Sequence, residues 1–370
     1  MSAEAGAALA GSPRTISDTE MKPSATSSSN PEALGTLAAL DDQRSSSLLA
    51  RLRGRGIRLL PHEYVFTLFL ALTCGRLAVH VGFFNPLTLT FLGFVLASAS
   101  VILWSGPEPR PWRWRVRLLL YPVLMGLTFY LMRPVVTALE VPRADALLVN
   151  WDMVWLHSNI NLAIQGWEPP LFTDLMMLAY VFFFYYLVAG PGYYCIHDLA
   201  RFKQCFSGLF VVYALGFLGY TTLPAGGPHR FLEFARPLTG GRLTRLAKPF
   251  LDYASNGVDA FPSIHVAVSL YLLAFDRMYY RRRFWRVLAP CVALWISTIY
   301  LRYHYGVDVI AGMAFATVGL WAANRYGRTC LDPHGSSQIM DAVETAPALI
   351  QPAMLSRMAQ ENGNANEIRA

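Results

Sequence analysis

Two histidines, each at an end of an apolar run, are the residues of this chain best suited to chemistry. The stretch FPSIHVAVSL places His265 at the start of one run, and YLRYHYGVDV places His304 at the end of the next. Asp308 follows His304 by four residues. On a helix that spacing puts both side chains on one face, so the carboxylate can accept a hydrogen bond from one ring nitrogen and leave the other free. The pair predicts a histidine nucleophile oriented by a carboxylate.

His265 would supply the second group that a bond cleavage needs, a proton donor for the leaving oxygen. Pro262 can begin the following helix, and Ser263 offers a hydroxyl near its first turn. A single histidine at the end of a span is more often an interfacial polar residue than a catalyst. Two histidines at one membrane face, one with an aspartate four residues on, favour a functional site, because ionisable groups at membrane depth are rare and usually functional.

The composition is that of a polytopic membrane protein. Of the 370 residues, 54% are hydrophobic and 15% are charged, which is far from the balance of a soluble domain. A membrane-spanning helix needs about 20 apolar residues. The sequence predicts an all-α bundle of about eight spans: roughly 64–83, 86–104, 117–138, 170–191, 205–223, 263–280, 286–303 and 306–325.

The net charge of +7 indicates orientation rather than nucleic-acid binding, because the basic residues cluster in short links between the apolar runs. If those links are cytoplasmic, both termini are cytoplasmic and the histidines open on the non-cytoplasmic face. We expect an integral protein of the cell membrane. The predicted outer segment 224–262 breaks this pattern with five basic residues, which suggests that positive charge has a task there.

Four regions are predicted along the chain. Residues 1–60 would be a disordered, basic cytoplasmic tail, 61–116 two accessory transmembrane helices, 117–326 a six-helix catalytic core, and 327–370 a second disordered tail. The five cysteines have no CxxC or His/Cys ligand spacing, so we expect neither a disulfide nor a metal site.

The two histidine motifs resemble those of a known family. FPSIH and YHYGVD look like the PSxH and HxxxD signatures of the type 2 phosphatidic acid phosphatase superfamily. STIYLRYHYGVDVIAG is similar to the branch that includes inositol phosphorylceramide synthases and inositolphosphotransferases. The resemblance runs from about Asp152 through Gly312.

The resemblance implies a helical membrane enzyme that needs no metal or cofactor. His304 would attack phosphorus, a phosphohistidine would form, and His265 would protonate the departing oxygen. Water or a lipid alcohol would then take the phosphoryl group. The implied partners are a phospholipid or lipid phosphate substrate, a possible lipid alcohol acceptor and the membrane itself, with no nucleic acid.

The phosphate would be held by a basic loop. The family's first motif has the form KxxxxxxRP, and PAGGPHRFLEFARP matches it with His229 in place of Lys and with Arg236 before the proline. Arg230 is the better candidate, because a guanidinium grips phosphate with two donors and keeps its charge, whereas His229 would do so only when protonated. The alternative is a loop that binds headgroups without a catalytic role.

One position departs from the phosphatase pattern. The third motif of the phosphatases has Arg six residues before the nucleophile, where this chain has Thr298. Arg302 is a candidate substitute, although on a straight helix it points away from His304. Arg133, near the end of the third span, either binds phosphate or reaches toward headgroups. Asp152 either lines a cleft or is an ordinary interfacial residue.

We therefore predict an integral membrane lipid phosphotransferase, similar to inositolphosphotransferases, that moves a phospho-headgroup. Loss of the motif arginine favours transfer over hydrolysis. The first alternative is a lipid phosphate or diphosphate phosphatase that uses the same histidines. The second is a non-enzymatic lipid-binding protein or transporter, which would place ionisable residues near mid-span, whereas those in this chain cluster at one face.

Overall fold

The fold consists of helices and loops. The computed structural model describes residues 59–106 and 110–330, with only the backbone for Thr329 and Cys330. No strand occurs in these ranges, where a single bridge joins Ala225 to Asp259. The predicted all-α fold is thus confirmed. Its helices are α2 (Pro61–His80), α3 (Pro86–Ser105), α4 (Pro111–Ala138), α5 (Asp145–Leu156), α6 (Ile160–Ala163), α7 (Pro170–His197), α8 (Leu199–Thr222), α9 (Pro228–Phe231), α10 (Arg242–Ala254), α11 (Ile264–Tyr279), α12 (Arg281–Tyr300) and α13 (Gly306–Cys330).

Proline sets the start of four long helices. Pro61, Pro86, Pro111 and Pro170 are the first residues of α2, α3, α4 and α7. At this position the missing N–H would have had no partner inside the helix, and the fixed backbone angle suits the first turn. The prolines therefore mark helix starts that hydropathy alone placed up to several residues later.

Three basic segments predicted as links prove to be largely helical. Residues 111–117 form the first two turns of α4. α8 begins at Leu199 because the Asp198 side chain accepts a hydrogen bond from the Arg201 backbone N–H at 2.9 Å. Tyr280 alone separates α11 from α12. A helix with arginines in its first turns therefore replaces the expected loop.

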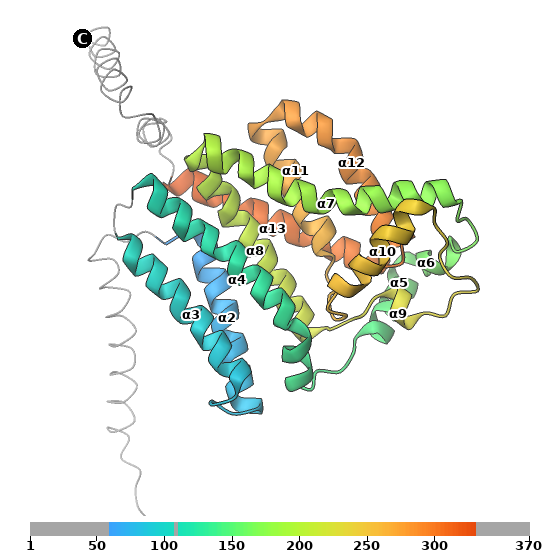
Figure 1. The fold of residues 1–370 in the computed structure, drawn as a ribbon, viewed down its shortest axis with the longest axis horizontal. Coiled ribbons are helices and arrows are strands. Elements are labelled where there is room, and N and C mark those ends of the chain that lie inside the picture. The colour runs from blue at the N-terminus through green and yellow to red at the C-terminus, as the bar shows by residue number, and fades with distance from the viewer. Residues whose placement is uncertain (1–58, 107–109, 331–370) are drawn as a thin grey trace, which may run out of the picture. The chain divides into compact units, whose positions relative to one another are not determined.

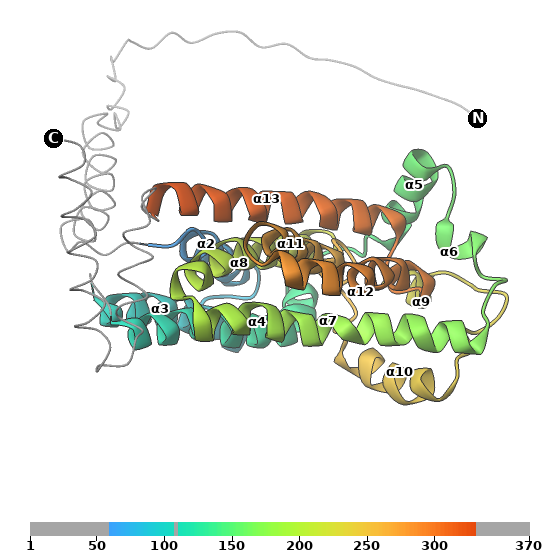
Figure 2. The ribbon, with the colours of Figure 1, turned by 90° about the horizontal axis from the view of Figure 1, so that it is seen from above.

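Helix α8 is the centre of the bundle. It packs against α2, α4, α7, α11 and α13, and most of its side chains are buried. In Figure 2, α13 lies on one side, α3, α4 and α7 lie on the other, and α8 and α11 lie between them. Gly208 and Gly319 let α8 and α13 approach closely, since a β-carbon on Gly208 would meet the Gly319 carbonyl. The central helix fixes how the site-bearing helices α11 and α13 lie.

The eight predicted spans all correspond to helices, but not all meet the requirements for crossing a membrane. Within the described residues, α3, α4, α7, α8 and α13 are long and apolar enough to do so. α11 has 16 residues, and α12 begins with three arginines. The chain is an integral membrane protein by this criterion, with five candidate spans. The three further crossings, by α2, α11 and α12, stay a prediction.

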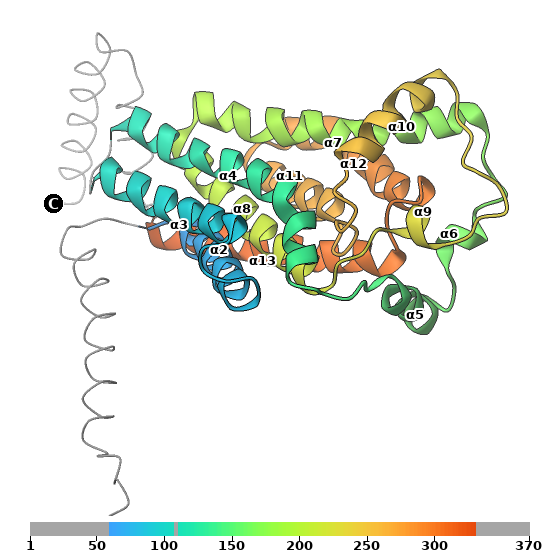
Figure 3. The same ribbon diagram turned by 60° about the horizontal axis from the view of Figure 1, so that its bottom comes forward.

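The short helices gather at one end of the bundle. Figures 1 and 3 show α5, α6, α9 and α10 together at the end where α11 begins and α12 finishes. Both histidine motifs lie at that end. Most of the predicted disordered tails, 1–60 and 327–370, lie outside the described residues. Of the described part, Leu60 is the buried N-cap of α2, and α13 continues to Cys330, beyond the expected boundary at 327.

The far end of α11 holds a buried polar cluster. The Asp276 carboxylate accepts hydrogen bonds from Tyr186 Oη at 2.8 Å and Tyr194 Oη at 3.1 Å. Arg283 of α12 pairs with the same carboxylate through Nε at 2.7 Å and through Nη2. This cluster ties α7, α11 and α12 together.

Candidate active site

His304 lies in the turn between α12 and α13 and is 2% exposed. Its Nδ1 lies 2.8 Å from the carbonyl oxygen of Ala260 and 3.4 Å from Asp308 Oδ2. A carbonyl can only accept, so Nδ1 carries the proton and Nε2 keeps its lone pair. The expected orientation of the ring is therefore present, with a backbone carbonyl as the nearer partner and the carboxylate as the second.

Asp308 is held by the start of its own helix. Its Oδ2 accepts a hydrogen bond from the Tyr305 backbone N–H at 2.8 Å. Its Oδ1 is buried without a hydrogen-bond partner among the described residues. The carboxylate thus retains acceptor capacity 3.4 Å from the His304 ring, where it would stabilise a positive charge on the imidazole.

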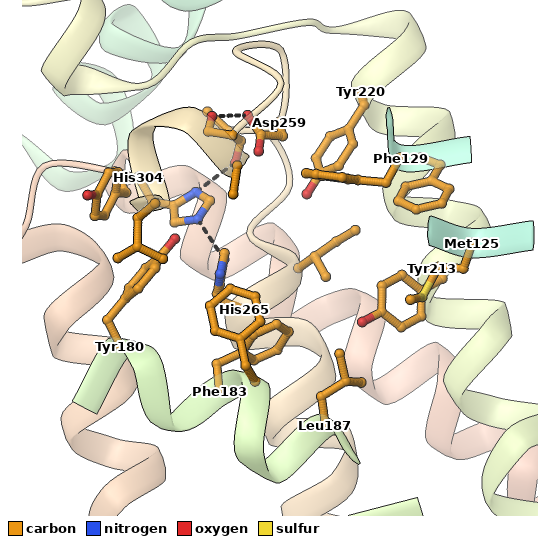
Figure 4. Close-up of a pocket in the computed structure, with 18 of the residues that line it drawn as sticks. Met125, Phe129, Tyr180, Phe183, Leu187, Tyr213, Tyr220, Asp259, His265 and His304 are labelled. Carbon is orange, nitrogen blue, oxygen red and sulfur yellow. Dashed lines mark hydrogen bonds between the residues drawn. The ribbon is translucent and has the colours of Figure 1, made fainter. Parts of the chain in front are cut away.

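His265 stands in the first turn of α11, beside His304. The His265 Nδ1 and the His304 Nε2 are 3.5 Å apart. Tyr180 and Phe183 of α7 flank the His265 ring with centroid distances of 4.5 Å each. Figure 4 shows the two imidazoles side by side at one wall of a cavity. The two rings, expected at one end of neighbouring apolar runs, lie together here, one on a helix and the other in a turn.

The cavity extends from the histidines into an apolar space of about 210 Å³. Figure 4 shows Met125 and Phe129 of α4 and Leu187 of α7 lining it away from the imidazoles. Asp259 is the carboxylate in its wall and accepts a hydrogen bond from Ser255 Oγ at 2.9 Å. A polar end with two histidines and an apolar interior would suit a molecule with a polar head and a hydrocarbon tail.

Two aspartates of α5 hold the backbone around the site. Asp145 accepts hydrogen bonds from the N–H groups of Gly226 and Gly227 at 3.0 Å or slightly more, and from Tyr305 Oη at 3.0 Å. Asp152 accepts from the Gly306 and Val307 N–H groups at 3.1 and 2.8 Å.

Asp152 therefore caps the first turn of α13, the helix that carries Asp308. Burial raises the pKa of the Asp152 carboxyl above its usual range. It does not line the cavity. Its helix-capping role differs from both readings of the sequence.

Arg230 and Arg143 lie together next to Gly226. A β-carbon on Gly226 would lie 2.7 Å from Arg143 Nη2 and 3.3 Å from Arg230 Cδ. Arg143 Nη1 donates to the Gly257 carbonyl at 2.7 Å, and its Nε lies 3.6 Å from Asp145. Sequence analysis missed Arg143, because it belongs to no motif. Its proximity to Gly226 arises only from folding.

His229 lines the cavity as a neutral ring. Burial, followed by the charge of Arg230, lowers the pKa of His229 to about 4. Its Nε2 accepts from Arg230 Nε at 3.0 Å, and its Nδ1 lies 3.2 Å from the Arg302 carbonyl. His229 therefore supplies no positive charge at neutral pH, unlike the lysine of the resembling motif.

Apart from His229, the predicted substrate-binding residues lie outside the cavity lining, Arg230 included. Ser263 is buried and caps α11, accepting from the Val266 N–H at 3.4 Å. Arg302 pairs with Glu168 and lies over the Phe234 ring at 3.8 Å. Arg236 is exposed and offers its carbonyl to Arg302 at 2.9 Å. Arg133 is exposed on α4.

Arg302 therefore cannot take the place of the motif arginine in this arrangement, because its guanidinium is occupied by Glu168. Thr298, at the position of that arginine, is buried. Its carbonyl accepts from the N–H groups of Tyr303 and His304 at 3.1 Å. No group of three or more His, Cys, Asp or Glu side chains suited to a metal ion occurs in the part of the chain that the structure describes.

Comparison with known proteins places the site in a recognised sequence segment. Residues 146–322 match a family model described as the PAP2 superfamily. No curated protein and no solved structure matches the chain. The matched segment contains His265, His304 and Asp308. This part of the molecule is similar to the PAP2 superfamily, which supports a membrane enzyme of the lipid phosphatase or phosphotransferase type.

Proposed function

We propose that this chain is a lipid phosphotransferase that moves a phospho-headgroup from one lipid to another through a phosphohistidine. The observation that carries the proposal is the position of His304. Its Nδ1 is engaged by the Ala260 carbonyl at 2.8 Å, and its Nε2 lies at the cavity 3.5 Å from His265. That arrangement suits nucleophilic attack by Nε2.

The first half of the reaction cleaves the donor lipid. His304 Nε2 attacks phosphorus, the N–P bond forms, and the bond from phosphorus to the oxygen of the lipid alcohol breaks. His265 enters this step as an imidazolium and gives one proton to that oxygen, which leaves the His265 ring neutral, and the alcohol departs with its hydrocarbon tail. The imidazole becomes positively charged, and Asp308, with its spare buried oxygen, stabilises that charge.

The second half returns the headgroup to a new alcohol. An acceptor hydroxyl gives its proton to His265 and attacks phosphorus, and the N–P bond breaks to restore His304. Water in the acceptor's place would make the enzyme a phosphatase. The apolar cavity walls at Met125, Phe129 and Leu187 favour a lipid acceptor over water.

Positive charge for the phosphate would come from Arg230, assisted by Arg143. Both side chains lie next to Gly226, which lines the cavity. Guanidinium groups hold phosphate oxygens with paired hydrogen bonds and keep their charge at any physiological pH. Since His229 is neutral there, Arg230 takes the task that the resembling motif gives to a lysine.

The topology forms part of the same proposal. We infer that 117–326 is the catalytic core, that the α2–α3 hairpin is accessory, and that the cavity opens on the non-cytoplasmic face of the cell membrane with both termini inside. The clustering of arginines at the start of α12, away from the histidines, supports this orientation.

Product analysis tests the proposal directly. The purified full chain is given phosphatidylinositol labelled in its headgroup, together with ceramide or diacylglycerol as acceptor. We expect label in a new lipid with the wild type and at least about a thousandfold less with His304→Ala. His157→Asn is the matched control, because His157 is exposed at the same end of the bundle and asparagine tolerates its positive φ of 54°. It should retain normal turnover.

Trapping the covalent intermediate distinguishes the proposed transferase from the alternative functions. Rapid acid-free quenching should show headgroup label on the wild-type protein and none on His304→Ala. Release of inorganic phosphate from phosphatidate without headgroup transfer would leave a phosphatase instead. Wild-type protein with neither reaction would point to the non-enzymatic class.

A further inference from the structure

Helix α10 presents large apolar side chains away from the protein. Leu246 is 78% exposed, Phe250 is 67% exposed and Tyr253 is 90% exposed. These residues are separated by four and then three positions, so they form one stripe along the helix. A contiguous exposed apolar stripe on a short helix marks an interaction surface.

The opposite face of α10 is fixed to the bundle. Asp174 of α7 accepts hydrogen bonds from the backbone N–H of Thr244 at 2.9 Å and from its hydroxyl at 2.6 Å. Leu251 is buried and lines the cavity that holds the histidines. The exposure of the apolar stripe is therefore a property of a well-anchored helix.

The charges of α10 favour an anionic surface as its partner. Arg242 and Arg245 are exposed, whereas Lys248 pairs with Asp252 at 2.6 Å. Thirteen residues make a helix of about 20 Å, which is shorter than the roughly 30 Å of a bilayer core. The helix is thus suited to lie in an interface and too short to cross one.

The location of α10 points to lipid and not to a soluble partner. It packs against α7, one of the five helices apolar enough to span a membrane. Figures 2 and 3 show α10 on the outer flank of α7, at the end of the bundle where the short helices gather. A face that continues the surface of a spanning helix, at one end of that helix, meets the headgroup layer.

We propose that α10 is an interfacial membrane helix. Leu246, Phe250 and Tyr253 insert at the boundary of headgroups and acyl chains, and Arg242 and Arg245 bind anionic headgroups in the leaflet on which the histidine cavity opens. Leu251, on the inner face of α10, forms part of the cavity wall. Insertion of α10 into the interface therefore holds that part of the wall at the depth of the lipid headgroups. This last consequence rests on the function proposed above.

Spin-label depth measurement tests the insertion. In a background with Cys74, Cys195 and Cys330 changed to serine, cysteine is introduced singly for Leu246, Phe250 and Tyr253, and the full chain is placed in nanodiscs of neutral and anionic lipid. Val188→Cys on α7 is the reference in the bilayer, and Thr239→Cys in the loop before α10 is the aqueous reference. Collisions with oxygen and with a water-soluble nickel chelate report depth.

We expect the α10 labels about 5–10 Å below the phosphates. Replacing Arg242 and Arg245 by Gln should lower the equilibrium constant for insertion of α10 into anionic lipid by about fivefold for each arginine. Added salt should lower that constant in the wild type only. Labels on α10 that are as accessible to the nickel chelate as the label at position 239 would overturn the proposal. So would labels shielded from both reagents with dipolar broadening, since a second copy would then cover the face.

A functional measurement complements the depth measurement. The variant with Leu246, Phe250 and Tyr253 all changed to Ser should raise KM for long-chain lipid in vesicles and leave kcat unchanged in detergent micelles. Label depth needs no turnover. An inactive chain with docked labels therefore contradicts only the proposed function, and an active chain with aqueous labels contradicts only the interfacial helix.

Discussion

Helix α11 carries a polar cluster at each end, and the two clusters differ in how completely their hydrogen bonds are satisfied. At the far end, Asp276 receives donors from two tyrosines and from Arg283. At the near end, His265 faces a cavity, and Asp308 beside His304 keeps one buried oxygen without a partner among the described residues.

The difference distinguishes buried polar groups that stabilise the fold from buried polar groups that are available for chemistry. A buried acceptor without a partner costs about 1–3 kcal/mol, so the near cluster holds capacity for an interaction that the resting protein does not make. The far cluster has no such capacity and lies away from the cavity. Both clusters contain buried ionisable groups, so burial alone does not identify the site.

Among changes that leave the nucleophile His304 in place, removing the proton donor should have the largest effect. His265→Ala is expected to lower kcat by about 10²–10⁴-fold on natural lipid, because general acid catalysis contributes that much. A substrate with a nitrophenol leaving group needs no proton and should lose far less. Equal losses on both substrates would remove His265 from that role.

Breaking the far cluster should damage stability without changing the chemistry. Asp276→Asn leaves Arg283 uncompensated and should destabilise the fold by about 3–5 kcal/mol, measured by thermal unfolding in detergent. Turnover per folded molecule should stay within about twofold. Changing both residues to Leu and Met is the matched control and should recover much of the stability. A selective loss of kcat would place Asp276 in the chemistry.

Asp308→Asn should have a smaller effect than the loss of His265. The Ala260 carbonyl already fixes the ring at 2.8 Å, so the variant loses only the charge that stabilises the imidazolium. Hydrogen bonds to charged groups contribute about 1.5–3 kcal/mol, which corresponds to about a ten- to hundredfold loss in kcat. An unchanged rate of phosphohistidine formation in single-turnover experiments would contradict this role.

His229→Gln should have the smallest effect, confined to acid. The folded-state pKa of about 4 lies below the ordinary value of 6.5, so the unfolded chain binds more protons between these pH values. The stability contribution is therefore complete above pH 6.5 and is lost as pH falls through about 4. The variant should lose less stability on acidification and keep its activity at pH 7, measured by unfolding midpoints across this range.

Sequence analysis could predict the elements of the site that depend on local spacing. Runs of apolar residues predicted the helices, and the spacing of His304 and Asp308 predicted that these two side chains lie together. Both predictions depend only on residues that are close in the sequence. The helix starts were less accurate, since an arginine-rich first turn such as that of α12 has the composition of a loop.

The parts that sequence could not supply depend on contacts between distant segments. The Ala260 carbonyl is invisible in a sequence because every residue has one, and it lies 44 positions from the ring it orients. Arg143 and Asp152 act through backbone groups more than 100 positions away. Arg302 and Ser263 looked like ligands by spacing, yet packing assigns them to Glu168 and to a helix cap.

Because Tyr280 alone joins α11 to α12, the distance between the two imidazoles depends on the number of residues in α12. With no loop to absorb a change, adding one residue within α12 would turn everything after it by about 100° and advance it by about 1.5 Å. His304 would then no longer lie beside His265 in the cavity wall. Insertions and deletions between Arg281 and Tyr300 should therefore be far less tolerated than substitutions on the outward face of the same helix.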